Sequence, residues 1–291
     1  MTWLLDRFPK LPLYWQLTRL NKPIGIYLLL WPTLWALWIA GEGQPSVANV
    51  VIFILGVVLM RSAGCVINDY ADRHVDGHVK RTKERPLAQK LISEKQALGL
   101  FAGLCLCAFL LVLLTNTFTI YLSLGGLALA SLYPFMKRYT HLPQVVLGAA
   151  FSWAIPMAFA AQTNSLPDIV WLLYCANVLW TIVYDTEYAM VDRDDDLKIG
   201  IKSTAVLFGE ADRHIIAVLQ GLTVFTWLLI ANQINATWPI YVAILVSTGI
   251  FAYHQWLIKE RDRAQCFKAF LHNHWIGAAM FVGLVAHYSL K

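Results

Sequence analysis

The chain has 291 residues, of which 58% are apolar or aromatic and only 14% are charged, whereas a soluble globular domain carries about 25% charged residues. A mean hydropathy of +0.55, with 12 Trp and 12 Tyr, indicates an integral membrane protein and excludes a disordered chain, a coiled coil and a disulfide-linked scaffold. The net charge of +5 could indicate a nucleic-acid partner, but the positions of the basic residues give it another explanation.

Nine apolar runs are long enough to cross a bilayer as helices, which takes roughly 20 residues each. They cover residues 24–41, 46–66, 97–115, 118–136, 144–161, 167–187, 214–232, 238–258 and 270–289. The shortest connections can only join neighbouring antiparallel helices. We therefore predict an all-α polytopic membrane protein with nine transmembrane helices, forming a single domain over residues 1–291. The N-terminal residues lack a cleavable signal pattern, so the first run is expected to act as its own insertion signal.

Lysine and arginine concentrate on one side of the predicted bundle. All of them except Arg61 and Lys291 fall before the first run or in every second connection after it, and the alternate connections carry none. Cytoplasmic loops of membrane proteins are enriched in these residues, so we expect a cytoplasmic N-terminus and, after nine spans, a C-terminus on the outer side. Membrane orientation thus explains the basic charge, and no nucleic-acid partner is expected.

The acidic residues form two clusters, one after the second run and one after the sixth. The first contains Asn68, Asp72 and Asp76, and the second contains Asp192 and Asp196. A spacing of four places side chains on one helical face, about 6 Å apart along the axis, where like charges repel. Such a row favours a cation, and Mg²⁺ prefers carboxylate, water and phosphate oxygens. We interpret the clusters as two metal sites facing a diphosphate; two solvated acidic loops are the alternative.

Basic residues follow each acidic cluster closely. Arg81 and Arg85 come after the first cluster, and Lys198 and Lys202 come after the second. Cations beside carboxylates and a metal would neutralise an arriving polyanion, which makes these four residues candidates for substrate binding. The alternative for each of them is an ordinary orientation signal, because cytoplasmic Lys and Arg occur in any membrane protein.

Three further charged groups lie deeper in the predicted bundle. Arg61 lies within the second run, about two helical turns below the first acidic cluster. Asp185 has the same relation to the second cluster, and Lys137 ends the fourth run four residues after Tyr133. A charged residue inside a span indicates a functional site, with snorkelling to the interface as the alternative for Arg61.

Several segments resemble the UbiA superfamily of intramembrane aromatic prenyltransferases. They are NDYADRHVD at 68–76, RTKERPL at 81–87 and YDTEYAMVDRDDDLKIGIKST at 184–204, with further similarity in LTRLNKPIG at 17–25 and YPFMKR at 133–138. The resemblance covers essentially the whole chain. Within the superfamily the chain most resembles the bacterial 4-hydroxybenzoate polyprenyltransferases of ubiquinone biosynthesis, for which the run DTEYAMVDRDDD is typical.

The resemblance implies nine transmembrane helices around a central cavity that two motif loops cap on the cytoplasmic side. It also implies Mg²⁺-dependent transfer of a prenyl group from polyprenyl diphosphate to 4-hydroxybenzoate, in the bacterial inner membrane. Asn68, Asp72 and Asp76 would then hold one Mg²⁺, and Asp192 and Asp196 the other.

The resemblance assigns substrate roles as well. Tyr133 and Lys137 would lie near the diphosphate, and Arg61 would correspond to a deep arginine associated with the substrate. Arg138 is a second candidate for the aromatic carboxylate, and the sequence does not choose between the two arginines.

In the mechanism that these observations favour, the allylic C–O bond ionises and the ring carbon ortho to the phenol hydroxyl attacks the cation. Asp72, Asp192, Asp185 and Arg61 are the expected catalytic residues, with Asp185 or Asp192 accepting the proton. A different aromatic or quinone-precursor acceptor is the first alternative. A cation-coupled transporter is the second, although transporters usually place their acidic residues deep in broken helices. The preferred prenyl length and the oligomeric state have no signal in the sequence.

Overall fold

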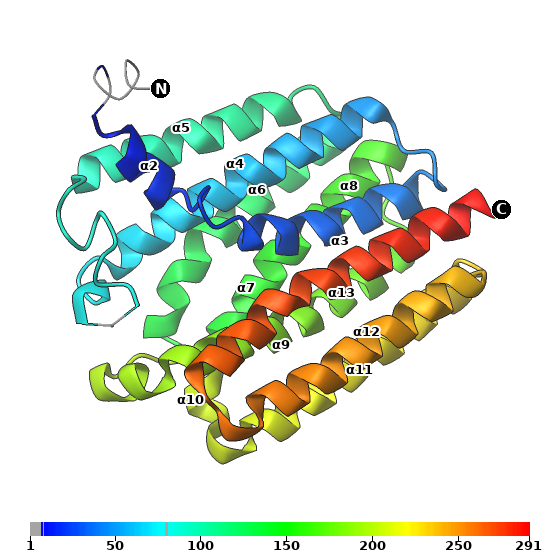
Figure 1. Cartoon of the computed structure of the whole chain (residues 1–291). Helices are drawn as coiled ribbons and strands as arrows, with labels where there is room; N and C mark the ends of the chain where they lie inside the picture. Colours follow the sequence, from blue (N-terminus) through cyan, green and yellow to red (C-terminus); the bar gives the residue numbers. More distant parts are fainter. Residues whose placement is uncertain (1–6, 8, 79–80) are drawn as a thin grey trace.

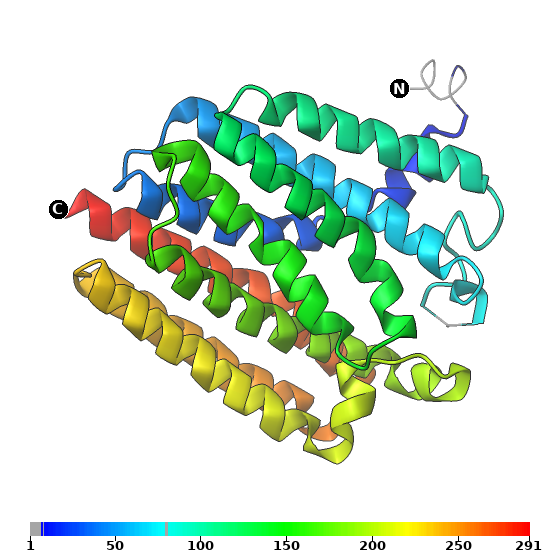
Figure 2. The ribbon, with the colours of Figure 1, turned by 180° about the vertical axis from the view of Figure 1, so that it is seen from behind.

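The computed structural model describes residues 7, 9–78 and 81–291, and over these residues it contains helices and no strand (Figures 1 and 2). Part of the N-terminal segment to which the insertion-signal prediction applies lies outside the described residues. The α-helices are α2 (Leu11–Leu17), α3 (Ile24–Ala40), α4 (Val47–Asp72), α5 (Glu94–Val112), α6 (Thr117–Leu132), α7 (Pro143–Ser152), α8 (Ala154–Thr163), α9 (Ile169–Ile199), α10 (Thr204–Phe208), α11 (Asp212–Gln233), α12 (Trp238–Leu257) and α13 (Arg263–Ser289). The 3₁₀ segments are η1 (Asp76–His78), η2 (Tyr133–Arg138), η3 (Gly209–Ala211) and η4 (Ile258–Glu260).

The predicted apolar runs are helical in the structure. Eight helical segments of the described chain are long and apolar enough to cross a membrane. The first run forms α3, whose 17 residues span about 25 Å, at the lower limit for a crossing. The prediction of a polytopic all-α membrane protein is therefore confirmed, and the count of nine spans depends on including α3.

The fifth crossing is broken into α7 and α8, which meet at Trp153. Pro156 lies in the first turn of α8, and because proline has no amide hydrogen, the carbonyl of residue 152 lacks its usual helical donor. The break turns the Trp153 side chain toward α6, where its indole nitrogen donates to the carbonyl of Leu122 at 2.7 Å.

The centre of the bundle is aromatic. The ring of Trp35 on α3 lies 5.4 Å from that of Trp180 on α9 and 5.0 Å from that of Trp227 on α11. Its indole nitrogen donates to the carbonyl of Gly277 on α13 at 3.0 Å. The contact with Trp227 is edge-on and that with Trp180 is tilted. Aromatic pairs add stability beyond the burial of area, and here they join with the hydrogen bond to connect four helices at Trp35.

Three helices extend well beyond the predicted apolar runs: α13 begins earlier, at Arg263, and α4 and α9 end later. α4 continues to Asp72, and α9 continues through the second acidic cluster to Ile199, where Gly200 at φ +70° ends it. The second cluster is therefore part of a helix rather than of a capping loop. Asp76 lies beyond the end of α4, in η1, so a turn rather than the helical repeat brings it to the first cluster.

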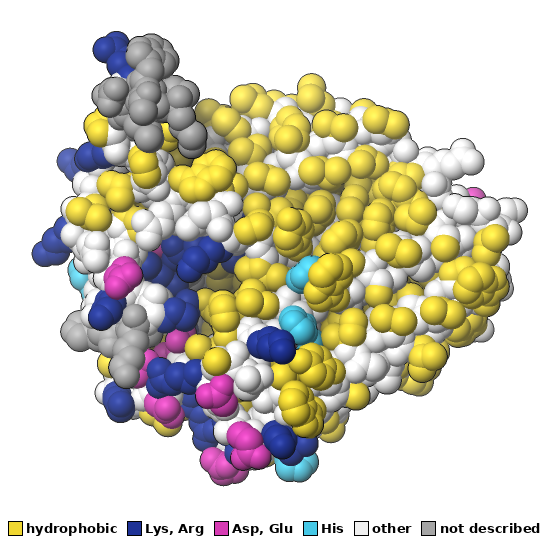
Figure 3. Space-filling model, viewed as in Figure 1, with side chains coloured by type: hydrophobic (Ala, Val, Ile, Leu, Met, Phe, Trp, Pro, Cys, Tyr) yellow, Lys and Arg dark blue, Asp and Glu magenta, His cyan; other side chains and the backbone are white. Residues whose placement is uncertain are grey.

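Charged side chains gather at one end of the molecule, where α4 ends and α9 leaves the bundle (Figure 3). In this view the basic and acidic groups surround a hollow, whereas the rest of the visible face is mostly apolar. The C-terminus lies at the opposite end (Figure 1). On this face the molecule therefore has one polar end beside a surface compatible with lipid.

Candidate active site

A cavity of about 840 Å³ opens at the charged end of the bundle. Twelve of the predicted site residues line it: Arg61, Asn68, Asp72, Asp76, Arg81, Arg85, Tyr133, Lys137, Asp185, Asp192, Asp196 and Lys202. They come from α4, the 73–93 connection, η2, α9 and the connection after α9. Residues far apart in the sequence therefore share one cavity.

Asp72 stands at the last turn of α4 and is almost fully buried, with 3% of its surface exposed. Its Oδ2 forms an ion pair with the ammonium of Lys137 from η2 and accepts a hydrogen bond at 3.4 Å from the side-chain Nδ2 of Asn68. The other carboxylate oxygen, Oδ1, is buried without a hydrogen-bond partner. A buried carboxylate oxygen without a donor is costly, and a bound cation would satisfy it.

Asp192 lies on α9 across the cavity and is bound by an arginine from the 73–93 connection. Nε of Arg81 lies 3.1 Å from both carboxylate oxygens of Asp192, and its Nη1 donates to the hydroxyl of Tyr188. Burial alone would lower the pKa of Arg81, but the Tyr188 hydroxyl and the Asp192 carboxylate outweigh it and raise that pKa. The guanidinium is therefore a permanent positive charge at the cavity mouth.

Asp76 and Asp69 are bridged by one arginine. Nη1 of Arg85 lies 2.9 Å from Oδ2 of Asp76 and 3.0 Å from Oδ1 of Asp69. Burial would lower the pKa of Arg85, but these two carboxylates raise it. Asp69 also accepts two hydrogen bonds from Arg19, at 2.9 and 3.1 Å. These bonds join the segment between α2 and α3 to the first acidic cluster.

The acidic run of α9 divides between two faces of the helix. Asp192 and Asp196 line the cavity, whereas the carboxylates of Asp194 and Asp195 lie 3.1 Å from the guanidinium of Arg263 at the start of α13. The helical repeat explains the division, because positions four apart share a face. Asp192 and Asp196 therefore lie on the same face of α9, toward the cavity, as their spacing predicts.

Asp185 lies two turns below Asp192 and also lines the cavity. The side chain of Gln144, at the start of α7, is within hydrogen-bonding reach of its carboxylate. The oxygen of the same amide accepts from the backbone nitrogen of Thr204 at 3.1 Å. The side-chain amide nitrogen of Gln144 is therefore directed toward Asp185. These contacts connect α7, α9 and α10 beside this carboxylate.

Arg61 forms the inner wall of the cavity. Its Nη1 lies 3.0 Å from the sulfur of Cys65, its guanidinium carbon lies 5.8 Å from the ring centre of Phe151, and its Nε is buried without a partner. The guanidinium also packs against Gly25 of α3, where a methyl group would overlap it. A buried arginine nitrogen without an acceptor favours an anionic ligand.

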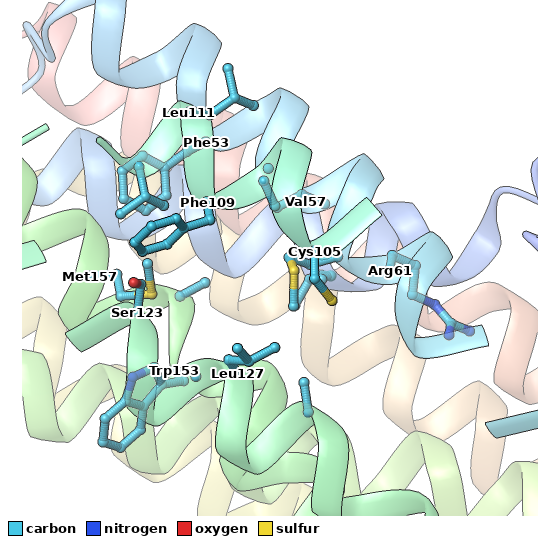
Figure 4. A pocket seen from close by; sticks show the side chains of 18 of the residues that line it. Phe53, Val57, Arg61, Cys105, Phe109, Leu111, Ser123, Leu127, Trp153 and Met157 are labelled. Carbon is cyan, nitrogen blue, oxygen red and sulfur yellow. The ribbon is translucent and has the colours of Figure 1, made fainter. Parts of the chain in front are cut away.

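A second pocket, of about 170 Å³, continues from Arg61 between α4, α5, α6 and α8 (Figure 4). The two hollows share Arg61, Tyr133 and Phe151 in their walls. We call the second hollow the apolar pocket, because its other walls are almost entirely hydrocarbon, including Phe53, Phe109 and Leu127 on the close-up view.

Two predicted substrate-binding residues are not among the described residues that line the cavity. Arg138 instead donates from Nη2 to the backbone carbonyl of Ala71, and its guanidinium carbon lies 5.6 Å from the ring centre of Phe135. Lys198 is exposed on the outer side of α9. The helical repeat of α9 explains the position of Lys198, because a residue two positions after Asp196 points to the opposite side of the helix.

Protein atoms alone do not form a complete metal cage here. Within the described part of the chain, no three His, Cys, Asp or Glu side chains converge tightly enough to hold an ion. The carboxylates of Asp72, Asp76 and Asp192 are instead paired with basic side chains. Mg²⁺ typically takes only one or two carboxylates and completes its shell with water and phosphate oxygens, so this donor set, with the unsatisfied Oδ1 of Asp72, fits it.

Sequence reasoning missed several contributors to the site. Arg19 lies before the first span, where a basic residue is an ordinary orientation signal. Gly25 and Gln144 carry no charge, so neither charge nor spacing identified them. Asp69 lies within the first quoted motif, but one position off its four-residue spacing. Tyr188 lies on the helical repeat, four residues before Asp192, but it carries no charge and received no role. For Arg19 and Gly25 the available signal was the segment LTRLNKPIG at 17–25, which resembles the superfamily but had no assigned role.

Comparison with known proteins agrees with this geometry. The model of the UbiA prenyltransferase family matches residues 29–282. The chain belongs to the UbiA prenyltransferase family. It is 64% identical over 95% of its length to a 4-hydroxybenzoate octaprenyltransferase of Pseudomonas fluorescens, covering 93% of that protein. It is 61% identical over 97% of its length to the Hahella chejuensis protein of the same name, covering 94% of it.

Solved structures of UbiA proteins have the same fold. A UbiA homologue from Aeropyrum pernix, in its apo form, superposes with a TM-score of 0.79 at 23% identity, covering 90% of this chain and 97% of that one. A homologue from Archaeoglobus fulgidus, bound to GPP and Mg²⁺, gives 0.75 at 18% identity, covering 95% and 99%. The predicted membership of the family and the predicted helical fold are thereby confirmed.

Proposed function

We propose that this chain transfers the prenyl group of a polyprenyl diphosphate to the ring of 4-hydroxybenzoate, ortho to the hydroxyl, and releases diphosphate in ubiquinone biosynthesis. The observation that carries the proposal is the junction of a cavity rich in paired charges with an apolar pocket at Arg61 and Tyr133. A substrate with an ionic head and a long hydrocarbon tail matches that junction. The names of the relatives at 60–64% identity support the choice of reaction.

The charged cavity supplies what a diphosphate needs. Arg81, Arg85, Lys137 and Lys202 line it as cations, and Mg²⁺ would bind at Asn68, Asp72 and Asp76 and at Asp192 and Asp196. Bound there, Mg²⁺ would stabilise negative charge on the departing diphosphate oxygens. The basic side chains that now pair with the carboxylates would hold the diphosphate from the same sides and orient the allylic carbon toward the interior.

Arg61 holds the aromatic acceptor in this proposal. Its guanidinium offers a planar, bidentate surface to a benzoate carboxylate, and its Nε has no acceptor within the protein. The ring would then stand between Arg61 and the acidic face of α9, with Asp185 or Asp192 accepting the proton that the ring loses. Arg138 is the less suitable of the two arginines, because the backbone of Ala71 already occupies it.

Exclusion of water is the remaining requirement. An allylic cation exposed to water becomes an alcohol, so the reacting carbon must sit against dry walls. Phe151 and Tyr133 line both hollows where they meet, and their rings would present a dry wall to the reacting carbon. An acceptor ring held at Arg61 would then be the nearest nucleophile to the cation.

The protein is a polytopic membrane protein, and we place it in the bacterial inner membrane. The charged end of the bundle would face the cytoplasm, with the N-terminus on that side and the C-terminus in the periplasm. The excess of Lys and Arg in every second connection supports this orientation. The active site would then open to the cytoplasm.

A membrane assay tests the proposed function. Membranes that contain the protein are incubated with 4-hydroxybenzoate and prenyl diphosphates of graded length, with and without Mg²⁺, and the products are analysed by mass spectrometry. We expect 4-hydroxybenzoate to gain one prenyl group only when Mg²⁺ is present. Prenylation of another aromatic acid in preference to 4-hydroxybenzoate would overturn the assignment of the acceptor, and solute movement without diphosphate release would indicate a transporter.

A further inference from the structure

We infer that Asn273 of α13 is a positioning residue for the charged cavity, because its side-chain amide sets the rotation of α9 and so directs Asp192 and Tyr188 toward Arg81. The inference rests on the proposed function and adds to it a contact on the side of α9 that faces away from the cavity. Three observations carry it: the two faces of α9, the complete hydrogen bonding of the amide, and the burial of the cluster.

α9 has one face toward the cavity and another toward α13, which packs beside it (Figure 1). Asp185, Tyr188 and Asp192 line the cavity, and their spacing of three and four residues keeps them on one face of the helix. Glu187 lies two positions after Asp185 and therefore points to the opposite side, toward α13. Trp180 precedes Glu187 by seven residues, or about two turns, and shares that side.

The amide of Asn273 binds both residues on this second face. Its Oδ1 accepts from the indole nitrogen of Trp180 at 2.9 Å, and its Nδ2 donates to Oε2 of Glu187 at 2.7 Å and to the carbonyl of Ala269 at 3.0 Å. An indole nitrogen only donates and a backbone carbonyl only accepts, so the amide has a single possible orientation. Because the two α9 residues lie about two turns apart, the bonds fix both the rotation and the height of α9 against α13.

The cluster is closed to solvent. The exposed fractions of Trp180, Glu187 and Asn273 are 1%, 0% and 0%, and none of them is among the described residues that line either hollow. His254 of α12 is equally buried, and its Nδ1 lies 3.5 Å from Oε1 of Glu187. Lipid is as apolar as the helices, so close packing and interhelical hydrogen bonds decide how membrane helices associate. A buried amide with both of its N–H groups bonded specifies one arrangement of α9 and α13.

A small rotation of α9 would displace the groups that it presents to the cavity. Side chains of an α-helix end about 5 Å from its axis, so a rotation of about 10° moves the Asp192 carboxylate by roughly 1 Å. Asp192 binds Arg81 through both carboxylate oxygens, and the Tyr188 hydroxyl accepts from the same guanidinium. A displacement of about 1 Å at a reacting site reduces a rate by about a hundredfold. Asn273 therefore acts on the cavity through α9, without touching substrate.

The test reverses the hydrogen bond between positions 187 and 273. Asn273→Asp removes the donor and brings two carboxylates together, Glu187→Gln keeps an acceptor for Asn273, and the double variant restores the bond with its donor at position 187. The probe is geranyl thiolodiphosphate, an unreactive diphosphate analogue, whose Kd is measured with Mg²⁺ by titration calorimetry on the full chain in detergent. We expect the Kd to rise about tenfold in Asn273→Asp and to stay within about twofold of wild type in the other two.

His287→Leu is the matched control, because it removes a buried hydrogen bond to Thr237 in the last turn of α13. It should lower the melting temperature and leave the Kd unchanged. The KM for 4-hydroxybenzoate should change little in Asn273→Asp, because the proposed site at Arg61 belongs to α4. A lowered melting temperature in Asn273→Asp with a wild-type Kd would overturn the positioning role, and so would a double variant that binds as weakly as Asn273→Asp.

If Asn273→Asp does not fold, Asn273→Ala takes its place, since a water molecule in the vacated space would bond to both α9 side chains. Its Kd should rise in the same way, and a wild-type value would overturn the inference. The wild type tests the proposed function separately. Failure of the wild type to bind the probe and to prenylate 4-hydroxybenzoate would reject that function, whereas results confined to the variants bear only on α9.

Discussion

The guanidinium of Arg61 on α4 packs directly against the backbone of Gly25 on α3, so closely that a methyl group at position 25 would overlap it. The first span therefore limits how the arginine is directed into the cavity. Because Nε of Arg61 is buried without an acceptor, this contact sets the position of a donor that remains available for a ligand. Gly25 is consequently a positioning residue for the proposed carboxylate site.

Gly25→Ala should displace the Arg61 guanidinium while the bundle remains folded, because the overlapping atoms belong to the end of a flexible side chain. We expect the KM for 4-hydroxybenzoate to rise about tenfold, which corresponds to roughly 1.4 kcal/mol. The KM for prenyl diphosphate should change little. Gly103→Ala is the matched control, because Gly103 on α5 is exposed and a Cβ atom there would meet no atom within 4 Å. Equal effects of the two variants would contradict the positioning role.

Arg61→Lys tests the bidentate contact itself. Lysine keeps the charge but loses the planar pair of donors, so we expect the KM for 4-hydroxybenzoate to rise ten- to a hundredfold, as for the loss of about 1.5–3 kcal/mol in a charged hydrogen bond. Arg61→Ala should cost more still. Steady-state kinetics with each substrate varied in turn gives the answer. If only the KM for prenyl diphosphate rises, Arg61 belongs to the diphosphate site and Arg138 becomes the candidate for the carboxylate.

Asp72→Asn and Asp192→Asn should abolish turnover without unfolding the protein. Each removes one anionic ligand from the proposed metal–diphosphate site, at a cost of several kcal/mol in the transition state. Asparagine is preferable to alanine at 72 because this side chain is buried against Lys137. Activity and the melting temperature in detergent should be measured together. Asp194→Asn, whose carboxylate faces Arg263 and is 70% exposed, should stay active; near-normal activity at 72 or 192 would contradict the metal sites.

Chelation with EDTA should silence the wild-type enzyme, and added Mg²⁺ should restore it. The reason is that the described carboxylates do not form a closed cage, so a metal shared with substrate phosphate exchanges readily. The measurement is the rate of 4-hydroxybenzoate prenylation before and after Mg²⁺ is returned. Full activity in EDTA would show that the cationic side chains act without a metal.

The sequence by itself determined the helical membrane fold and most members of the candidate site. Apolar runs about as long as a bilayer is thick have no other stable form than helices, because lipid offers no hydrogen bonds to a free backbone. The four-residue spacing of Asp192 and Asp196 likewise predicted a shared face, since a helix has one fixed repeat. These are properties of a single segment, so a single segment reveals them.

Only the tertiary structure decided which partners those segments meet. The pairing of Asp72 with Lys137 and of Asp192 with Arg81 depends on how distant helices pack, and so do the contact between Gly25 and Arg61 and the amide of Gln144 directed at Asp185. The absence of Arg138 from the cavity lining has the same origin, whereas that of Lys198 follows from the helical repeat of α9. No local repeat encodes such contacts, because they arise from the packing of side chains across elements that are many residues apart.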